Sequence, residues 1–408
     1  MAGDLIAVEA ALARVLAAAT PIRDVEDVAL SDAFGRTLAR DLVALRTQPP
    51  SDVSAMDGYG VRAGDLAHSA ARVRLVGESA AGRGFAGRVN AGECVRIFTG
   101  APVPPGVDSV LLQEDAVVEG ERIGAKEAPG FGRHIRRRGL DFSEGAPGLA
   151  AGVRLGPAEL ALAAAMNHAR APVVRKPRVA VLATGDELVA PGAAASEEQI
   201  VCSNNFAVAA LVEAAGGVAV DLGIARDDLA ETEAAIARAR DCDALVTLGG
   251  ASVGDRDHVK DALARAGMAL DFWRLAMRPG KPLIHGTLGR TSVLGLPGNP
   301  VSSMVCALVF LVPLVRKLSG DRDPARDLRQ RATLGADVKA NDKRQDFLRA
   351  TLARAPDGRL IATPHALQDS SLISVFCASQ ALLIRPPHAP AARAGEDCTI
   401  LPLAPFAF

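Results

Sequence analysis

Short apolar runs alternate with stretches of helical periodicity between residues 177 and 318. Five of these runs are predicted to be buried strands: 178–182, 218–224, 244–248, 272–277 and 292–296. A helix is predicted over 204–215 with Ser203 at its N-cap, and another begins after Asp227 or Asp228, either of which can cap it. Strand–helix alternation of this kind predicts a doubly wound parallel sheet.

The pattern differs on either side of this unit. Helical spacing predicts one helix over residues 4–20, a second over 33–38 with Ser31 as N-cap, and a third over 157–169. Short β-type runs separated by glycine and proline recur over residues 73–140 and again near the C-terminus. Each of these two regions is predicted to be a small all-β domain.

The predicted fold class is therefore α/β plus β, in a chain of 408 residues that has room for several domains. It combines a doubly wound domain, an all-β insertion domain and a C-terminal β domain. The expected spans are 1–44 with 142–176 for an elongated helical linking domain, 45–141 for the β insertion, 177–318 for the doubly wound domain and 319–408 for the C-terminal β domain.

Composition and charge argue against several classes of protein. The formal net charge of −1 lacks the basic footprint of a nucleic-acid binder. The six cysteines are scattered without a Cys-x-x-Cys pair, which argues against a zinc ribbon and favours reduced thiols in the cytoplasm. The N-terminus, with acidic Asp4, lacks the pattern of a signal peptide. The apolar run 301–315 is too short to cross a bilayer and contains Pro313, so we expect a buried or interface helix and no membrane partner.

The most informative stretch covers residues 243–263. The strand 244–248 leads into a glycine turn, after which Val259, Ala262 and Leu263 recur at helical spacing. A strand, a glycine loop and a helix in this order present backbone N–H groups to an anion, and glycines let a bulky ligand approach closely. The candidate contacts are Gly249, Gly250, Gly254, the hydroxyl of Ser252 and the carboxylates of Asp255 and Asp257. The alternative is an ordinary turn with a solvated, acidic helix start.

Ligands of a doubly wound sheet bind beyond the carboxyl ends of its strands. Four unusual loops are expected to meet there: the loop after Thr184, the Gly249 loop, residues 278–282 and residues 296–300. Acidic and cationic or hydroxyl side chains occur in these loops and elsewhere: Asp57, Asp141, Asp186, Glu187, Asp227, Asp228, Asp255 and Asp257, and Arg278, Lys281, Lys260, Ser252 and Ser302. Carboxylates beside a phosphate site favour Mg²⁺, so this set suits a substrate with phosphates and a second oxyanion.

Two features outside this edge have ordinary alternatives. Asp57 precedes a glycine, and the alternative to a functional role is that it simply caps that turn, the commoner use of an Asp-Gly pair. The basic run between Gly132 and Gly139 is either a solvated hairpin or an anion-binding face. The seven histidines are isolated, and no Ser-His-Asp or Cys-His arrangement is visible, which argues against a nucleophilic hydrolase.

Six segments, in order along nearly the whole chain, carry a family resemblance. They are Ser54-Ala-Met-Asp57-Gly-Tyr, Ile97-Phe-Thr99-Gly-Ala-Pro, Ala183-Thr-Gly-Asp-Glu187-Leu, Gly249-Gly-Ala-Ser-Val-Gly254, Pro279-Gly-Lys281-Pro and Leu296-Pro-Gly-Asn-Pro300-Val-Ser-Ser. Together they resemble the molybdopterin molybdenumtransferase family, the bacterial MoeA type that is similar to the gephyrin E domain.

The resemblance implies an activity and an assembly. The activity is insertion of molybdenum from molybdate into adenylylated molybdopterin (molybdopterin-AMP), assisted by Mg²⁺, with hydrolysis of the pyrophosphate bond and release of AMP. The assembly is an elongated homodimer of four-domain subunits, whose helical linking domain serves dimerisation. The β insertion of one subunit would close a cleft between the partner's doubly wound domain and C-terminal β domain.

The family's site residues carry over to matching positions of this sequence. The cleft positions are Asp57, Thr99, Asp141, Glu187 and Asp257, with Asp228, and among them Asp57, Glu187 and Asp257 are expected to hold Mg²⁺. The molybdate-binding positions are Lys281, Ser302, Ser370 and Arg349. Substrate binding is further expected at Gly249, Gly250, Ser252, Gly254, Pro297, Pro300 and Arg278.

Two departures and two rival functions accompany this hypothesis. Arg278 stands where the family typically has lysine, and His258 replaces a usual tyrosine, but neither change removes an acidic position.

One rival function is that of a molybdopterin adenylyltransferase, whose single domain resembles residues 177–318; the additional β domains argue against it. The other rival is a non-catalytic scaffold, which has no need of the retained carboxylates. Another protein of the same pathway is a further conceivable partner.

Overall fold

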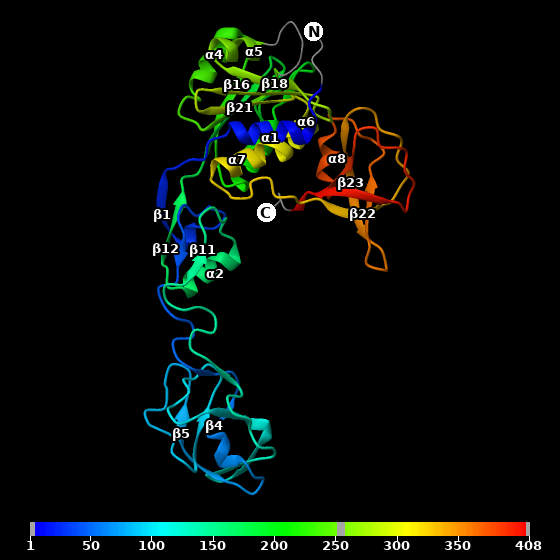
Figure 1. Cartoon of the computed structure of the whole chain (residues 1–408). Coiled ribbons are helices and arrows are strands. Elements are labelled where there is room, and N and C mark those ends of the chain that lie inside the picture. The colour runs from blue at the N-terminus through cyan, green and yellow to red at the C-terminus, as the bar shows by residue number, and fades with distance from the viewer. Residues whose placement is uncertain (1–4, 251–257, 405–408) are drawn as a thin grey trace.

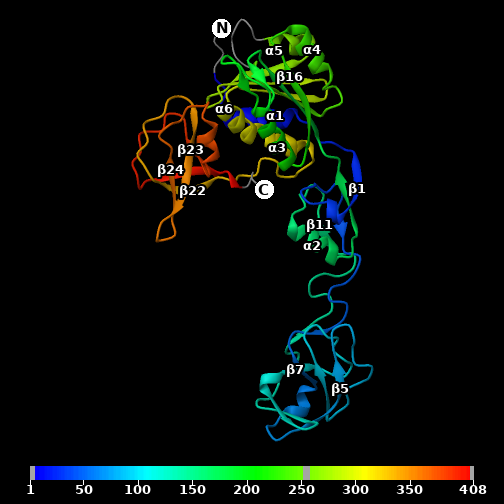
Figure 2. The same cartoon turned by 180° about the vertical axis from the view of Figure 1, so that it is seen from behind.

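The computed structural model describes residues 5–250 and 258–404 of an elongated chain whose domains are arranged in a row (Figure 1). An α/β domain lies at one end with a C-terminal β barrel beside it. A small linking domain follows, and the insertion domain occupies the opposite end. Seen from behind, two passages of the chain join the linking domain to the insertion domain (Figure 2). The multi-domain α/β plus β fold predicted from the sequence is confirmed.

The α/β domain is built on a sheet with the strand order β16-β13-β17-β21-β20-β18. Its strands are β13 (Arg178–Thr184), β16 (Val218–Ala225), β17 (Ala244–Leu248), β18 (Ala269–Arg274), β20 (Pro282–Leu288) and β21 (Thr291–Leu296). The prediction of a parallel sheet holds for β16, β13, β17 and β21, whereas β20 and β18 pair antiparallel. Only Gly289 and Arg290 separate β20 from β21, and a parallel connection needs a crossover of about a dozen residues or more.

Helices cover both faces of this sheet. One face carries α1 (Val8–Ala18), α3 (Asn204–Ala214), α6 (Pro300–Cys306), η4 (Ala307–Leu311) and α7 (Val312–Leu318). The other face carries α4 (Leu229–Ala237) and α5 (His258–Arg265). Cover on both faces makes the sheet doubly wound, as predicted. The N-terminal helix α1 thus shares its core with the α/β domain.

Residues 300–318 form the long helix of this core. Within the described ranges it is the helix that is long and apolar enough to cross a membrane, yet 72% of its apolar window is buried inside the structure. Its π-helical segment η4 comes just before Pro313, which has no backbone N–H to donate. The expectation of a buried helix at this position is confirmed.

The linking domain consists of two short ribbons and one helix. Strand β1 (Val25–Ala29) pairs with β12 (Arg170–Val174), β2 (Leu42–Val43) pairs with β11 (Pro147–Leu149), and α2 spans Pro157–Ala165. The predicted helix over 33–38 is wrong. A single turn η1 (Leu30–Asp32) ends just before this segment. Gly35 then turns the chain away at a φ of +70°, and its N–H donates to the Leu155 carbonyl at 2.8 Å.

The insertion domain is all β, with the strand order β7-β4-β6-β5-β9-β8 and a separate pair, β10-β3. Its strands are β3 (Val53–Ser54), β4 (Gly58–Val61), β5 (Val73–Ser79), β6 (Glu93–Ile97), β7 (Ser109–Leu112), β8 (Ala116–Glu119), β9 (Arg122–Ala125) and β10 (Ile135–Arg136), with turns η2 (Ala63–Leu66) and η3 (Gln113–Asp115). Its small core includes Val61, Leu66 and Ile123.

The C-terminal domain is a barrel, because β23 pairs with both β24 and β25 and thereby closes the ring β23-β24-β22-β26-β25. Its elements are β22 (Gln330–Leu334), β23 (Gln345–Arg354), β24 (Leu360–Pro364), α8 (Ile373–Cys377), β25 (Ala381–Arg385) and β26 (Asp397–Pro402). A short strand from the α/β domain, β19 (Met277–Arg278), pairs with β23 on the outside of this ring. The two domains therefore share one sheet.

Candidate active site

A cavity of about 730 Å³ lies at the carboxyl ends of β13, β17 and β21. Thr184 ends β13, Gly249 follows β17 and Pro297 follows β21, and all three line the cavity together with Pro282 at the start of β20. The four loops that were predicted to converge do meet here. The volume falls within the range of small-molecule sites, about 300–1,000 Å³. We call this space the glycine-loop cavity.

The backbone at Gly249 approaches its neighbours too closely for any side chain. Its φ is +98°, and a Cβ added there would lie 2.8 Å from the Thr184 carbonyl oxygen. The Gly249 N–H is directed to the Leu296 carbonyl at 3.1 Å, which joins the ends of β17 and β21. Gly250, with a φ of +62°, lines the cavity as well. Both glycines have the backbone freedom that the sequence motif predicts.

Carboxylates stand at the rim of the glycine-loop cavity. Glu187 and Asp227 line it, and the Asp227 N–H donates to Oδ1 of Asp186 at 3.1 Å. Of the two candidate caps, Asp228 is the one that caps α4, since its Oδ1 accepts from the Glu231 N–H at 2.8 Å. Asp228 is therefore engaged in the fold, while Glu187 and Asp227 face the space.

Four predicted contacts, Ser252, Gly254, Asp255 and Asp257, lie outside the described residues. Among the residues that are described, no group of three His, Cys, Asp or Glu side chains comes together in a way that could hold a metal ion. The rim strands β14 (Leu188–Val189) and β15 (Ile200–Val201) also line the cavity, and Ile200 and Val201 are exposed there. The sequence carried no signal for this apolar rim.

A second cavity of about 550 Å³ lies between the α/β domain and the barrel. Lys281 and Ser302 reach it from the α/β domain, and Arg349 and Ser370 reach it from the barrel. Pro282 lines both cavities, so the two adjoin. All four residues that the resemblance assigns to molybdate binding are thus brought to one place. We call this space the cation cavity.

Arg349 is the most unusual side chain of the cation cavity. It is 1% exposed, one terminal N–H donates to the Asp369 carbonyl at 3.0 Å, and its Nε has no hydrogen-bond partner within the described structure. Burial lowers the pKa of the guanidinium, and the Asp369 carboxylate opposes this shift. A guanidinium remains protonated even so. A buried, charged group with an unused donor suits an anion as its missing partner.

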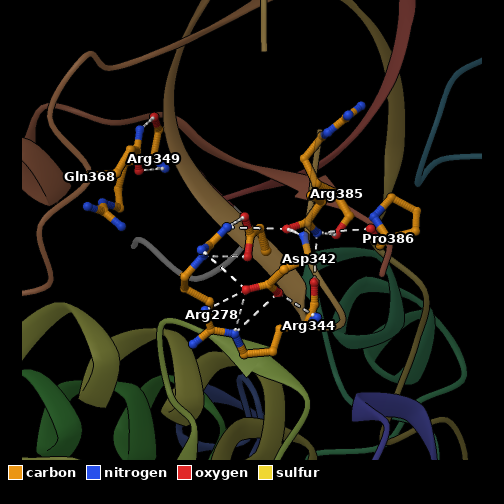
Figure 3. A network of polar contacts seen from close by, with 9 residues as sticks. Arg278, Asp342, Arg344, Arg349, Gln368, Arg385 and Pro386 are labelled. Atoms are coloured by element: carbon orange, nitrogen blue, oxygen red, sulfur yellow. Dashed lines mark hydrogen bonds and ion pairs between the residues drawn. The ribbon is translucent and has the colours of Figure 1, made fainter. Parts of the chain in front are cut away.

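Two amide side chains that the sequence reasoning did not single out as site residues fix these loops. Gln368 brackets the backbone of Arg349, accepting from its N–H and donating to its carbonyl, both at 2.9 Å (Figure 3). Asn299 donates to the Ser370 hydroxyl at 3.0 Å and so links the 296–300 loop to the barrel. Their positions in polar loops were visible in the sequence, but their pairings across domains were not.

Arg278, a predicted substrate contact, lines the cation cavity but directs its guanidinium to carboxylates. Its Nε donates to Oδ1 of Asp346 at 2.8 Å, a terminal nitrogen pairs with Oδ2 of the same residue, and Asp342 lies 3.7 Å away (Figure 3). Lys281 is exposed at the cavity, as Arg278 is, but no ion pair joins it to a carboxylate of the described residues. The two cations of this loop therefore have different surroundings.

Asp57 and Thr99 lie in the insertion domain and Asp141 lies next to it. This domain is at the opposite end of the molecule from the α/β domain, whose loops line the two cavities (Figure 1). Thr99 donates to Oδ1 of Asp57 through its backbone N–H at 2.7 Å and its hydroxyl at 2.8 Å. These bonds, the backbone one first, lower the pKa of Asp57. Asp141 is exposed near the linking domain, and its N–H donates to the Gln48 carbonyl at 3.1 Å. One chain does not bring these residues to Glu187.

Three family models match the chain in succession. The MoeA N-terminal region (domain I and II) matches residues 6–167, the probable molybdopterin binding domain matches residues 180–317, and the MoeA C-terminal region (domain IV) matches residues 331–403. Together they cover most of the sequence.

Proteins of known name and structure resemble the chain along nearly its full length. The molybdopterin molybdenumtransferase of Haemophilus influenzae is 36% identical over 91% of this chain and 92% of its own, and that of Bacillus subtilis is 32% identical over 89% and 86%. A crystal structure of the molybdopterin biosynthesis MoeA protein of Pyrococcus horikoshii has 27% identity and a TM-score of 0.82, covering 97% of this chain and 99% of its own.

Proposed function

The chain belongs to the molybdopterin molybdenumtransferase family, and on this premise we propose that it inserts molybdenum from molybdate into adenylylated molybdopterin, with Mg²⁺ bound, and releases AMP. It is a transferase of molybdenum cofactor biosynthesis. The observation that carries the finer proposal is the pair of adjoining cavities, one with a glycine loop and carboxylates and one with cations and hydroxyls.

The glycine-loop cavity is the proposed site of the pterin nucleotide. The positive φ angles of Gly249 and Gly250 leave backbone open for phosphate contacts, because no Cβ stands in the way. Pro297 and Pro300 form a stiff wall, and the exposed apolar side chains of Ile200 and Val201 offer a surface for flat rings. Ser252 and Gly254 are proposed as further contacts.

The cation cavity is the proposed molybdate site. Molybdate is a dianion, and Lys281, Arg349 and the hydroxyls of Ser302 and Ser370 supply complementary charge and donors. The buried Arg349 has an unused Nε, which an oxyanion would satisfy. Since Pro282 lines both cavities, pterin and oxyanion would be bound as neighbours, and much of the rate gain would come from their positioning.

The donor chemistry of the rim fits Mg²⁺. Glu187 and Asp227 present hard oxygen donors at the glycine-loop cavity, and Mg²⁺ needs only one or two carboxylates when phosphate oxygens and waters complete its shell. We assign Glu187 and Asp257 of one subunit and Asp57 of another as its ligands. When bound, the ion would offset negative charge on the phosphoanhydride. Glu187→Gln is expected to raise the Mg²⁺ concentration needed for half-maximal activity.

A homodimer completes the proposed site. Asp57, Thr99 and Asp141 stand far from the cavities of their own chain, so a second copy of the elongated chain would have to bring its insertion domain to them (Figure 1). A cytoplasmic location agrees with six free cysteines, four of them buried.

The decisive experiment is a single-turnover reaction of the purified protein with adenylylated molybdopterin and Mg²⁺, with and without molybdate. Molybdate-dependent release of AMP is the expected result. Pterin binding without AMP release in either condition would instead favour a scaffold. Formation of adenylylated pterin from ATP would favour the adenylyltransferase.

A further inference from the structure

A strand of the α/β domain is built into the barrel that faces it. Strand β19 leaves the α/β sheet after β18 and pairs in parallel with β23, in the register Met277 with Gln345 and Arg278 with Asp346. The chain then returns to the α/β sheet as β20. This pairing joins the two walls of the cation cavity on the side of Lys281 and Arg349, in addition to the contact of Asn299 with Ser370.

Arg278 and Asp346 form an ion pair at that point. The contact is bidentate, with Nε on Oδ1 at 2.8 Å and a terminal nitrogen on Oδ2. Asp346 is 4% exposed, and its hydrogen bonds raise the pKa of Arg278. The Arg278 side chain is 46% exposed, so the pair is buried only on the side of Asp346, and loss of the cation would leave a buried carboxylate without its partner. Arg278 also donates to Oδ1 of Asn341 at 3.2 Å.

Each member of the pair stands three positions before a cation of the cavity. Lys281 follows Arg278 in the α/β domain, and Arg349 follows Asp346 in the barrel. The ion pair therefore fixes the two segments from which the proposed oxyanion ligands project. A change in its geometry would move Lys281 relative to Arg349.

We propose that Arg278 and Asp346 are positioning residues, which hold Lys281 and Arg349 at the spacing that an oxyanion requires, and that Arg278 is not itself an oxyanion ligand. This inference rests on the proposed molybdate site. It departs from the expectation that Arg278 contacts substrate, because the edge of its guanidinium formed by Nε and one terminal nitrogen is occupied by the Asp346 carboxylate.

The two roles of Arg278 predict opposite effects when Asp346 loses its charge. If Arg278 binds the oxyanion, Asp346 competes with the ligand, and Asp346→Asn strengthens molybdate binding. If the pair positions the cavity walls, Asp346→Asn loosens them and weakens molybdate binding. Simple removal of a negative charge near an anion site also favours binding. Weaker molybdate binding by the Asp346→Asn variant is therefore explained by the positioning role and not by the other two effects.

The test is calorimetric titration of full-length protein with molybdate. Asp346→Asn is expected to raise the molybdate Kd about tenfold. The double variant Arg278→Gln with Asp346→Asn is expected to have a molybdate Kd no higher than that of Arg278→Gln alone, because the effects of two residues that act as one unit are not additive. The Kd of adenylylated molybdopterin is expected to stay within about twofold in Asp346→Asn, because the glycine-loop cavity does not include the pair.

Asp342→Asn is the matched control. It removes the same charge from the same segment, but Asp342 lies 3.7 Å from Arg278, is 45% exposed and pairs mainly with Arg344 at 2.7 Å (Figure 3). Its molybdate Kd is expected to stay unchanged or to fall. If Asp346→Asn does not fold, as judged by circular dichroism, Asp346→Glu replaces it: this variant keeps the charge and shifts the pair by one methylene, and a raised Kd is expected.

Three results would overturn the inference: a Kd for Asp346→Asn equal to or below that of the unmodified protein, an equal rise in Asp342→Asn, or an unchanged Kd in Asp346→Glu. Absence of molybdate binding by the unmodified protein is a different failure. It would remove the molybdate site itself, and with it the proposed function.

Discussion

Asp57 and Thr99 form a closed pair on the surface of the insertion domain, although 42 positions separate them in the chain. The two hydrogen bonds from Thr99 keep the Asp57 carboxylate ionised and in one orientation. The insertion domain lies at the opposite end of the molecule from the α/β domain, and Asp57 does not line either cavity in the described structure (Figure 1). An ionised carboxylate that is held in one orientation is suited to bind a metal ion, and we expect Asp57 to do so in the site of another subunit.

Mixing two inactive variants tests whether the site is shared between subunits. Asp57→Asn changes the insertion domain and Lys281→Ala changes the α/β domain at the opposite end of the molecule. Each variant alone is expected to lower activity by about 100-fold or more. After exchange of subunits in a 1:1 mixture, half of the dimers are mixed and each has one intact site, so about a quarter of full activity is expected to return. A mixture that stays inactive although mass spectrometry detects mixed dimers would contradict the shared site.

Replacing Arg349 separates binding from stability. Arg349→Met keeps the volume of a long side chain and removes a buried charge, so the thermal unfolding midpoint is expected to stay or to rise. The molybdate concentration for half-maximal activity is expected to increase about tenfold or more, as hydrogen bonds to charged groups are lost. An unchanged molybdate requirement would exclude Arg349 from the oxyanion site.

A methyl group at Gly249 tests the backbone geometry of the glycine loop. Gly249→Ala forces a Cβ to 2.8 Å from the Thr184 carbonyl oxygen at a φ of +98°, with a cost of about 1–3 kcal/mol in stability and loss of pterin binding. Gly192→Ala is the control, because Gly192 has a φ of +84° with open space around it. Equal unfolding midpoints for the two variants would show that the close approach to Thr184 has no effect.

His285 is expected to make the protein less stable in mild acid. Burial lowers the pKa of this imidazole, while a hydrogen bond to Oδ2 of Asp271 at 3.0 Å opposes the shift, and Arg14 pairs with the same carboxylate. The unfolded chain, with an ordinary histidine pKa of about 6.5, then takes up the proton first. Stability is present above pH 6.5 and decreases as the pH falls from there toward the folded pKa.

The measurement is the thermal unfolding midpoint at pH 7.5 and pH 5.5. His285→Gln keeps a donor for Asp271 without a titrating ring, so its midpoint is expected to fall less than that of the unmodified protein. The depressed pKa of Asp271 acts at lower pH and leaves this window unaffected. An identical fall in both proteins would assign the acid sensitivity to other groups.

Local patterns in the sequence were sufficient for elements whose cause is local. The strand Ala244–Leu248 is apolar throughout and is fully buried, and its bounds were predicted as they stand. The helix over 33–38 failed because Gly35 pairs with Leu155, a partner 120 positions away that no local window contains. The antiparallel pairing of β18 and β20 was missed because no strand was predicted over 282–288, so the two-residue turn at Gly289 that joins β20 to β21 was not recognised.

Contacts between distant segments limited the prediction of the site. The convergence of loops at Thr184 and Gly249 followed from the general rule for doubly wound sheets. The ion pair between Arg278 and Asp346 could not be predicted in this way, because the two residues are 68 positions apart and belong to different domains. Residue types indicate which groups could bind an anion, while the fold decides which of them are already paired.

The two-stranded ribbon of β1 and β12 connects the α/β domain to the linking domain and, through it, to the insertion domain (Figure 1). Strand β1 leads from the α/β domain toward the insertion domain and the antiparallel β12 leads back, so a change in the ribbon's twist would displace the insertion domain, which carries Asp57, relative to the α/β domain (Figure 2). Catalysis would then respond to torsion in a segment that binds no ligand. Natural variation at this ribbon could tune turnover while leaving the affinities for pterin and oxyanion as they are.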